Sequence, residues 1–179
     1  FSTPNFLNTM IPLSMSLIFI FIYLSFNTTN IKSVISYLAF SQVSIIFYIF
    51  CLKEYHAAMF YFITLSLSIT MLYLSIGYVV SKFNNISNVK VMGGIIFKMP
   101  SMFLFTLIAF LSTSGVPFFS GFYSYEVIIS TFYNSEQAIL VPSILIGISA
   151  SFLISYVFLK NIILIFLGKN KGNIHEFNK

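Results

Sequence analysis

Residues 111–126 read Leu-Ser-Thr-Ser-Gly-Val-Pro-Phe-Phe-Ser-Gly-Phe-Tyr-Ser-Tyr-Glu and interrupt an almost continuous apolar sequence. The stretch holds two glycines, a proline, several hydroxyl side chains and the carboxylate of Glu126. Irregular backbone at membrane depth is tolerated only where protein covers it or where it lines a water-filled cavity. An acidic side chain beside such a break is typical of an ion path. The stretch therefore predicts a functional discontinuity within a membrane-spanning segment.

The composition around this stretch indicates the class of protein. Of 179 residues, 58% are hydrophobic and 7% are charged, and the sequence has no Arg, Asp or Trp. Such a composition is typical of a polytopic membrane protein rather than of a soluble domain. Phe, Ile, Tyr, Asn and Lys together make up nearly half of the chain, as in the products of AT-rich coding sequences, and mitochondrial genomes are often of that kind. With one cysteine, Cys51, and two separated histidines, the sequence predicts neither a disulfide nor a metal site.

Apolar runs long enough to cross a bilayer, roughly 20 residues, occupy about 6–26, 31–52, 57–81 and 140–167. A fifth segment, 101–133, is interrupted at 115–121, so that it is compatible with two short crossings or with one long broken helix. The lysines favour the broken helix, because a single crossing gathers most of them on one side of the membrane. That side would carry Lys32, Lys82, Lys90, Lys98, Lys169, Lys171 and Lys179 with Glu176, and the other only Lys53, Glu54, His56 and Glu136.

The sequence thus predicts an all-α, polytopic transmembrane helix bundle with about five crossings, one of them a discontinuous helix. Residues 1–168 would form the bundle, and residues 169–179 would form a polar, basic tail at its surface. The lysine-rich side is expected to face the matrix or the cytoplasm.

Two ionisable side chains are candidate proton carriers. Lys32, at the start of the second apolar run, is either an interface lysine or a relay lysine that is desolvated enough to release its proton reversibly. Glu126 follows the break, and a carboxylate at membrane depth must be protonated, paired or hydrated. It is therefore part of a proton path or lies at headgroup level. Phosphate-binding loops, dinucleotide fingerprints and nucleophile motifs are absent from the sequence, so no cofactor is predicted.

Several longer segments carry a resemblance. Residues 30–48 (NIKSVISYLAFSQVSIIFY) are followed by 60–81 (FYFITLSLSITMLYLSIGYVVS) and 88–100 (NVKVMGGIIFKMP), and then by 115–126 (GVPFFSGFYSYE) and the closing segment 151–167. In order and spacing these segments resemble the antiporter-like membrane subunits of respiratory complex I (NADH:ubiquinone oxidoreductase). Each motif is weak alone, whereas their ordered succession from about 28 to 168 is specific.

The resemblance implies a multi-pass subunit of the mitochondrial inner membrane that conducts protons, coupled to NADH:ubiquinone electron transfer elsewhere in the complex. It implies no flavin, iron–sulfur cluster or quinone site in this chain. The chain would be one subunit of the enzyme and would hold no redox centre itself. Expected partners are other membrane-arm subunits and lipid, and no nucleic acid. Only the later half of the family's sequence is matched, so that either another chain supplies the N-terminal half or the subunit is truncated.

The chain departs from the family at protonatable positions. Chain 5 subunits have two histidines and a lysine where this sequence has Tyr61, Leu65 and Ile69, and a lysine at the break where it has Tyr125. Chain 2 subunits lack those histidines as well but usually keep the lysine at the break. Length and the missing groups favour chain 2, whereas the words Met-Gly-Gly, Ser-Gln and Gly-Phe-Tyr-Ser favour chain 5, so the sequence does not separate the two types. Lys32 alone stands at a position where the family also has a protonatable lysine.

The prediction is accordingly a proton-translocating subunit with Lys32 and Glu126 as relay residues. The broken helix is assigned to Gly115, Pro117, Gly121 and Tyr125. Two alternatives stay open: a structural remnant of such a subunit with an inactive proton path, and a fragment of a cation/proton antiporter.

Overall fold

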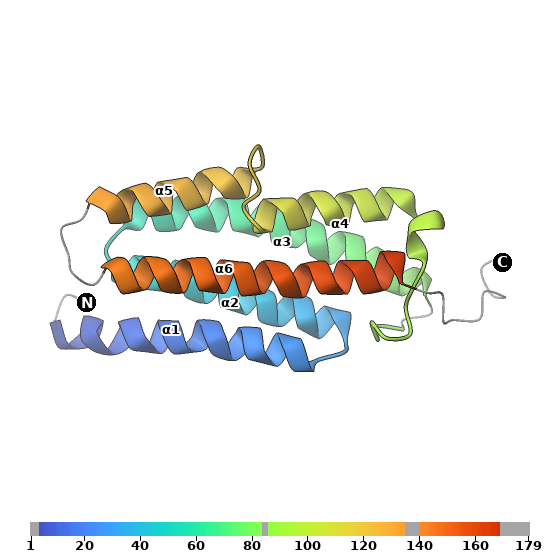
Figure 1. Cartoon of the computed structure of the whole chain (residues 1–179), viewed down its shortest axis with the longest axis horizontal. Coiled ribbons are helices and arrows are strands. Elements are labelled where there is room, and N and C mark those ends of the chain that lie inside the picture. The colour runs from blue at the N-terminus through green and yellow to red at the C-terminus, as the bar shows by residue number, and fades with distance from the viewer. Residues whose placement is uncertain (1–3, 84–85, 135–139, 169–179) are drawn as a thin grey trace.

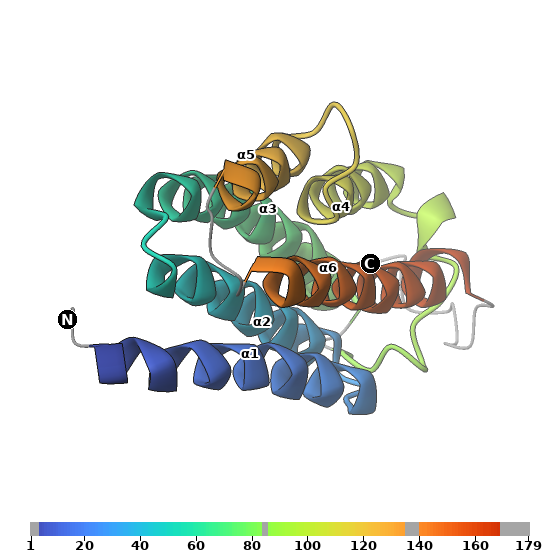
Figure 2. The same cartoon turned by 60° about the vertical axis from the view of Figure 1, so that its left-hand side comes forward.

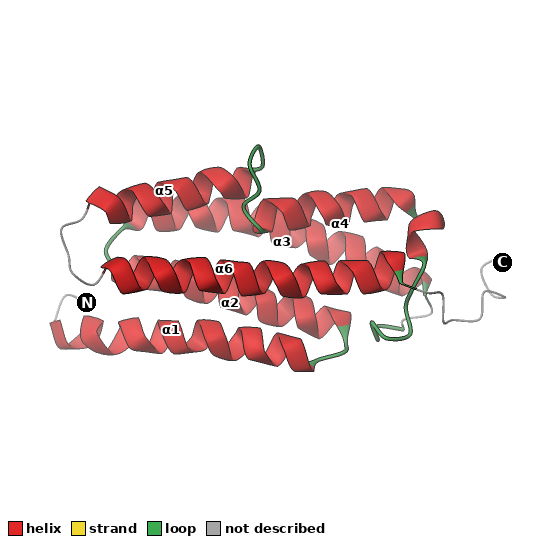
Figure 3. Cartoon of the chain, viewed as in Figure 1, coloured by secondary structure: helices red, strands yellow, loops and turns green. Residues whose placement is uncertain are grey.

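A computed structural model describes residues 4–83, 86–134 and 140–168, and within them the chain is helical, with no strand (Figure 3). Glu136 and the predicted tail, 169–179, lie outside the described residues. The elements are α1 (Pro4–Asn27), α2 (Ile31–Cys51), α3 (Tyr55–Lys82), the 3-10 turn η1 (Ile95–Phe97), α4 (Pro100–Thr113), α5 (Ser120–Asn134), α6 (Leu140–Ile162) and the π-helical η2 (Ile163–Leu167), which prolongs α6.

The helices run side by side along one common direction and form a bundle (Figure 1). Four of them, α1, α2, α3 and α6 with η2, are long and apolar enough to cross a membrane. The shorter α4 and α5 follow one another end to end alongside α3, and the loop between them stands out from the bundle in both Figure 1 and Figure 2. The α4–α5 pair is therefore the discontinuous helix that the sequence predicts, and the all-α fold class is confirmed.

Because α1, α2, α3 and α4 run in alternating directions, the lysines of their turns and connections are divided between the two ends of the bundle. The α1–α2 turn and the α3–α4 connection lie at one end, and the α2–α3 turn lies at the other (Figure 1). Lys32, Lys82, Lys90 and Lys98 belong to the first end, whereas Lys53 belongs to the second. The lysine asymmetry that favours a single broken crossing is thus present in the described part of the chain.

Backbone hydrogen bonds fix the start of α2 against the α3–α4 connection. The Asn30 side chain accepts a hydrogen bond from the Lys32 amide at 3.2 Å, which caps the helix. The Ile31 amide donates to the Ser87 carbonyl and the Val89 amide to the Thr29 carbonyl, both at 2.9 Å. Lys32 is therefore held beside the lysine-rich connection at this end of the bundle.

The break between α4 and α5 follows from its glycines and proline. Gly115 adopts φ +72°, a left-handed conformation that glycine takes without steric cost. Pro117 has no amide hydrogen to continue the helix. At Gly121 a β-carbon would overlap the carbonyl oxygen of Ser112, so that only glycine lets α5 approach the end of α4 this closely. The local sequence thus ends one helix and begins the next in contact with it.

Candidate functional site

Three side chains from three helices meet in the interior beside the break. The hydroxyl of Tyr61, on α3, donates a hydrogen bond to Oε1 of Gln42, on α2. It also lies 3.1 Å from the hydroxyl of Tyr125, on α5, and the two tyrosine rings pack with centroids 5.4 Å apart. Tyr61 and Gln42 are buried, with 2% and 1% of their surface exposed. Nε2 of Gln42 has no hydrogen-bond partner among the described residues. This cluster, Gln42–Tyr61–Tyr125, joins α2, α3 and α5 through polar groups at the depth of the break.

A second hydrogen-bonded row lies next to it. The hydroxyl of Ser112, on α4, is 2.7 Å from that of Ser68, on α3, and 2.8 Å from that of Ser120, at the start of α5. Ser68 donates its own hydrogen to the Thr64 carbonyl at 2.9 Å. Because a serine hydroxyl has one hydrogen, the row is polarised: Ser120 donates to Ser112, and Ser112 donates to Ser68. This serine row, Ser68–Ser112–Ser120, bridges the two halves of the broken helix to α3.

A small cavity lies between the cluster and the row. Its volume, about 10 Å³, is just large enough to hold one water molecule. Its walls come from both groups and from their neighbours: Tyr61, Thr64, Leu65, Ser68, Ser112, Thr113 and Gly121. Because both hydrogen-bonded groups contribute residues to its walls, the two groups adjoin each other.

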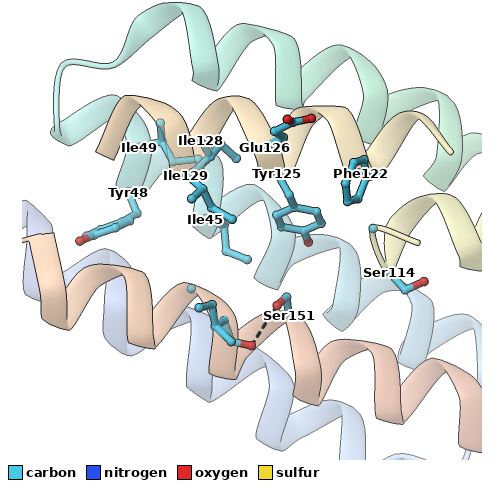
Figure 4. A pocket seen from close by; sticks show the side chains of 13 residues that line it. Ile45, Tyr48, Ile49, Ser114, Phe122, Tyr125, Glu126, Ile128, Ile129 and Ser151 are labelled. Atoms are coloured by element: carbon cyan, nitrogen blue, oxygen red, sulfur yellow. Dashed lines mark hydrogen bonds between the residues drawn. The ribbon is translucent and has the colours of Figure 1, made fainter. Parts of the chain in front are cut away.

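A larger cavity of about 410 Å³ opens between α2, α5 and α6 (Figure 4). Its lining is mostly apolar, with Ile45, Ile49, Ile128, Ile129 and Ile148 among the wall residues, and Ser114, Ser151, Tyr125 and Glu126 as polar members. In Figure 4 the Tyr125 side chain is directed from α5 toward α6, whereas the Glu126 carboxylate is directed away from α6. Tyr125 thus contacts both the large cavity and the interior cluster.

The two predicted relay residues lie apart. Lys32 is exposed in the first turn of α2, ten residues from Gln42, which is about 15 Å along the helix axis. Glu126 is exposed on α5, one residue beyond Tyr125. The structure brings Tyr125 into contact with Tyr61 and does not bring Lys32 and Glu126 together. Their roles as proton carriers stay predictions.

The residues assigned to the broken helix all lie at the break or next to it. A β-carbon on Gly115 would come within 2.6 Å of the Tyr125 ring, so the left-handed glycine leaves the space that this ring occupies. Gly121 lies against Ser112. Pro117 is exposed in the loop between the helices. Gly115 and Gly121 therefore shape the site, and Tyr125 supplies one of its hydroxyls.

Sequence reasoning misses the polar partners on the other helices. It marks Tyr61 only as a departure from the family, and it singles out none of Ser68, Ser112 and Ser120. A signal is nevertheless present: buried Tyr61, Thr64, Ser68 and Ser75 recur at helical spacing and form one polar stripe along α3. Within the described residues there is no group of three or more His, Cys, Asp or Glu side chains that could hold a metal ion.

Comparisons with known proteins agree with this architecture. The family described as NADH:quinone oxidoreductase/Mrp antiporter, TM, matches residues 1–167. NADH-quinone oxidoreductase subunit L of Rickettsia typhi (strain ATCC VR-144 / Wilmington) is 34% identical over 80% of this chain and 21% of its own length. NADH-ubiquinone oxidoreductase chain 5 of Dictyostelium discoideum is 31% identical over 82% of this chain and 23% of its own. Chain 5 of Lycodon semicarinatus is 34% identical over 69% and 21%.

The chain spans about a fifth of the length of these curated relatives. The match nevertheless covers every described helix, including both halves of the broken one. The chain therefore belongs to the family of membrane-embedded NADH:quinone oxidoreductase and Mrp antiporter subunits.

Proposed function

We propose that this protein translocates protons as a membrane-arm subunit of a respiratory NADH:ubiquinone oxidoreductase, in the place of the matched part of a chain 5 subunit. One observation carries the proposal: the Gln42–Tyr61–Tyr125 cluster and the serine row lie side by side at a helix break, and of their six members Ser120 alone is exposed. Polar groups inside a membrane bundle are costly, and they mark ion and proton pathways. The chain 5 name of several relatives supports the choice over chain 2.

The hydroxyl groups suit proton transfer because each can accept one proton while it releases another. Tyr125 would receive a proton at the large cavity and pass it to Tyr61, 3.1 Å away. A water molecule in the small cavity would continue the path to Ser68 and Ser112. Ser68 lies seven residues beyond Tyr61, about 10 Å nearer the lysine-rich end along α3. The path would therefore run along the polar stripe of α3.

Glu126 and Lys32 would serve this path at its two ends. Glu126, exposed beside Tyr125, would exchange protons between the outer surface of α5 and the interior hydroxyls. Lys32 would exchange them at the end of the bundle where the α3–α4 connection lies. In this proposal the Gln42–Tyr61–Tyr125 cluster and the serine row transfer the protons that histidines and lysines transfer in the family at positions 61, 65, 69 and 125.

In the same proposal the protein lies in the mitochondrial inner membrane, where it would contact other membrane-arm subunits and lipid. The amino-acid composition and the chain 5 relatives support that location. Electron transfer from NADH to ubiquinone would occur in other chains. A second chain that provides the part of the relatives beyond the matched segment is a further expected partner.

The test is proton pumping by the intact complex that contains Lys32→Ala or Glu126→Gln. We expect fewer protons per electron in each variant, while NADH oxidation continues. Lys53→Ala and Glu54→Gln are matched controls, because these residues form the short turn at the opposite end of the bundle, and they should pump normally. Normal pumping in both test variants would contradict the relay and would favour a structural remnant. Purification without NADH:quinone reductase activity would instead favour an antiporter fragment.

A further inference from the structure

Gln42 is the one member of the Gln42–Tyr61–Tyr125 cluster whose side chain does not titrate. It is 1% exposed, its Oε1 accepts the hydrogen bond of Tyr61, and its Nε2 has no hydrogen-bond partner among the described residues. A buried amide nitrogen without a partner is costly, because its two hydrogens have lost their hydration. In the orientation that the structure shows, only the oxygen side of the Gln42 amide is therefore satisfied.

The hydrogen bond to Gln42 decides where the hydroxyl hydrogen of Tyr61 lies. A tyrosine hydroxyl has a single hydrogen, and that of Tyr61 is directed to Oε1 of Gln42. In the contact with Tyr125, 3.1 Å away, Tyr61 therefore accepts and the Tyr125 hydroxyl donates. An amide oxygen accepts a hydrogen bond but does not take up the proton. With this orientation of the amide, a proton that moves from Tyr125 to Tyr61 has no exit.

A half-turn of the amide reverses this hydrogen bond. The terminal torsion of glutamine, χ3, is broad and roughly two-fold, and the amide oxygen and nitrogen are close in size, so the half-turn hardly changes the packing. Nε2 then donates to the Tyr61 oxygen, and Oε1 takes the position in which Nε2 has no partner. An oxygen is tolerated there at least as well, since unpaired backbone carbonyls are less rare in protein interiors than unpaired N–H groups. The two orientations are therefore close in energy.

The half-turn releases the hydroxyl hydrogen of Tyr61. Tyr61 lines the small cavity together with Thr64 and Ser68, so its hydroxyl would donate toward that cavity once Gln42 no longer accepts. Tyr61 would then gain the proton of Tyr125 while it gives its own to a water molecule in the small cavity. Tyr125 would in turn gain a proton from the large cavity. Each hydroxyl gains one proton and loses one, so no charge stays in the interior.

We propose that the Gln42 amide is a switch that closes and opens the proton path at Tyr61. With Oε1 toward Tyr61 the path is closed, and with Nε2 toward Tyr61 it is open. Gln42 is a positioning residue, since it carries no proton itself and acts through the hydrogen of Tyr61. The inference rests on the proton path proposed above, and it adds the element that keeps protons from flowing back when no electrons pass.

Passive proton leak through the intact complex tests the switch. In Gln42→Met an unbranched side chain with only a weakly accepting sulfur replaces the amide, so that the hydrogen of Tyr61 is no longer held. A minor conformation is typically populated to roughly 0.1–10%. A path that stays open should therefore speed the decay of a pH gradient across sealed vesicles without NADH by roughly tenfold or more. Fewer protons should be translocated per electron, while NADH oxidation continues.

Ser44→Ala is the matched control on the same helix. The Ser44 hydroxyl donates within α2, to the Phe40 carbonyl at 2.9 Å, and contacts no member of the cluster through this bond. The variant removes a polar group two residues from Gln42 and leaves the amide in place. Its leak and its proton pumping should equal those of the native complex. An equal increase of the leak in Ser44→Ala and in Gln42→Met would overturn the switch.

A double variant separates the switch from the path. Tyr125→Phe added to Gln42→Met should abolish the extra leak, because protons no longer reach Tyr61. If Gln42→Met adds no leak although Tyr125→Phe lowers pumping, the switch is overturned and the proton path stands. An extra leak that persists in the double variant would also overturn the switch, since it would run outside the cluster. Normal pumping in Tyr125→Phe alone would contradict the path itself, and with it the inference that rests on it.

Infrared spectroscopy observes the half-turn without altering Gln42. The complex is prepared with glutamine that is isotope-labelled at the side-chain carbonyl, and spectra at rest and during NADH oxidation are compared. We expect a labelled band that gains a component at higher frequency during turnover, as Oε1 loses the hydrogen bond of Tyr61. This change should be absent in Tyr61→Phe, which lacks the hydrogen bond in both states. The same spectrum at rest and during turnover in the native complex would overturn the switch.

Discussion

At the scale of single residues, the two glycines of the break have different tasks. Gly115 takes a left-handed conformation and leaves room for the ring of Tyr125, whereas Gly121 lets the backbone of α5 touch the end of α4. The sequence indicates both glycines, because Gly and Pro within an apolar run mark a break. It does not indicate which atoms they approach, since Ser112 and Tyr125 become their neighbours only when α4 and α5 fold into contact.

Gly121→Ala is expected to destabilise the protein by about 1–3 kcal/mol, since the new methyl group meets backbone that cannot move aside as a side chain would. The free energy of unfolding in detergent measures the effect. Gly77→Ala is the matched control: Gly77 lies within α3, a β-carbon added there would meet no neighbouring atom within 4 Å, and alanine should stabilise by about 0.5–1 kcal/mol. Equal changes in the two variants would contradict the close approach at Gly121.

At the scale of helices, side-chain hydroxyls join elements that hydrophobic packing alone leaves free to slide. Ser112 contacts Ser68 on α3 and Ser120 on α5, so that a single hydroxyl fixes both halves of the broken helix to a third helix. The apolar runs are sufficient to predict the helices and the interruption. The partners of Ser112 are not predictable in the same way, because hydrogen bonds between helices depend on their relative rotation, which the hydropathy of a segment does not specify.

Ser112→Ala removes the middle of the serine row and leaves Ser68 and Ser120 without their shared neighbour. We expect slower proton translocation at an unchanged rate of NADH oxidation, and a loss of stability of about 1 kcal/mol, the usual net value of a hydrogen bond. Proton uptake by vesicles containing the intact complex measures the first effect. Ser66→Ala is the control, since the Ser66 hydroxyl donates within its own helix, to the Ile63 carbonyl. If both variants pump alike, the serine row is not part of the path.

At the scale of the whole molecule, the charge distribution and the helix directions give one topology. Lysines gather at the end where α2 begins and α3 stops, and the positive-inside rule predicts that this end faces the matrix or the cytoplasm. This much is predictable from the spacing of lysines between apolar runs. The meeting of Tyr61 with Tyr125, 64 residues apart in the chain, is a property of the folded bundle that no local pattern carries.

The topology is tested with single cysteines in a Cys51→Ala background, because Cys51 is the one native thiol. Lys90→Cys in the α3–α4 connection and Lys53→Cys in the α2–α3 turn should react with a membrane-impermeant thiol reagent from opposite sides of the membrane. Sealed vesicles of known orientation provide the measurement. Labelling of both positions from one side would contradict a membrane crossing by α3, which separates them.

If protons pass through the Gln42–Tyr61–Tyr125 cluster, as proposed, proton pumping must depend on the Tyr125 hydroxyl, and the Tyr125→Phe variant is the decisive one to measure. This variant removes only the hydroxyl that faces Tyr61, and Tyr123→Phe removes an exposed hydroxyl from the same helix. The measurement is the number of protons translocated per electron by the intact complex. We expect a lower number of protons per electron for Tyr125→Phe and an unchanged number for Tyr123→Phe, with NADH oxidation retained in both. An unchanged number in Tyr125→Phe would contradict a proton path through the cluster.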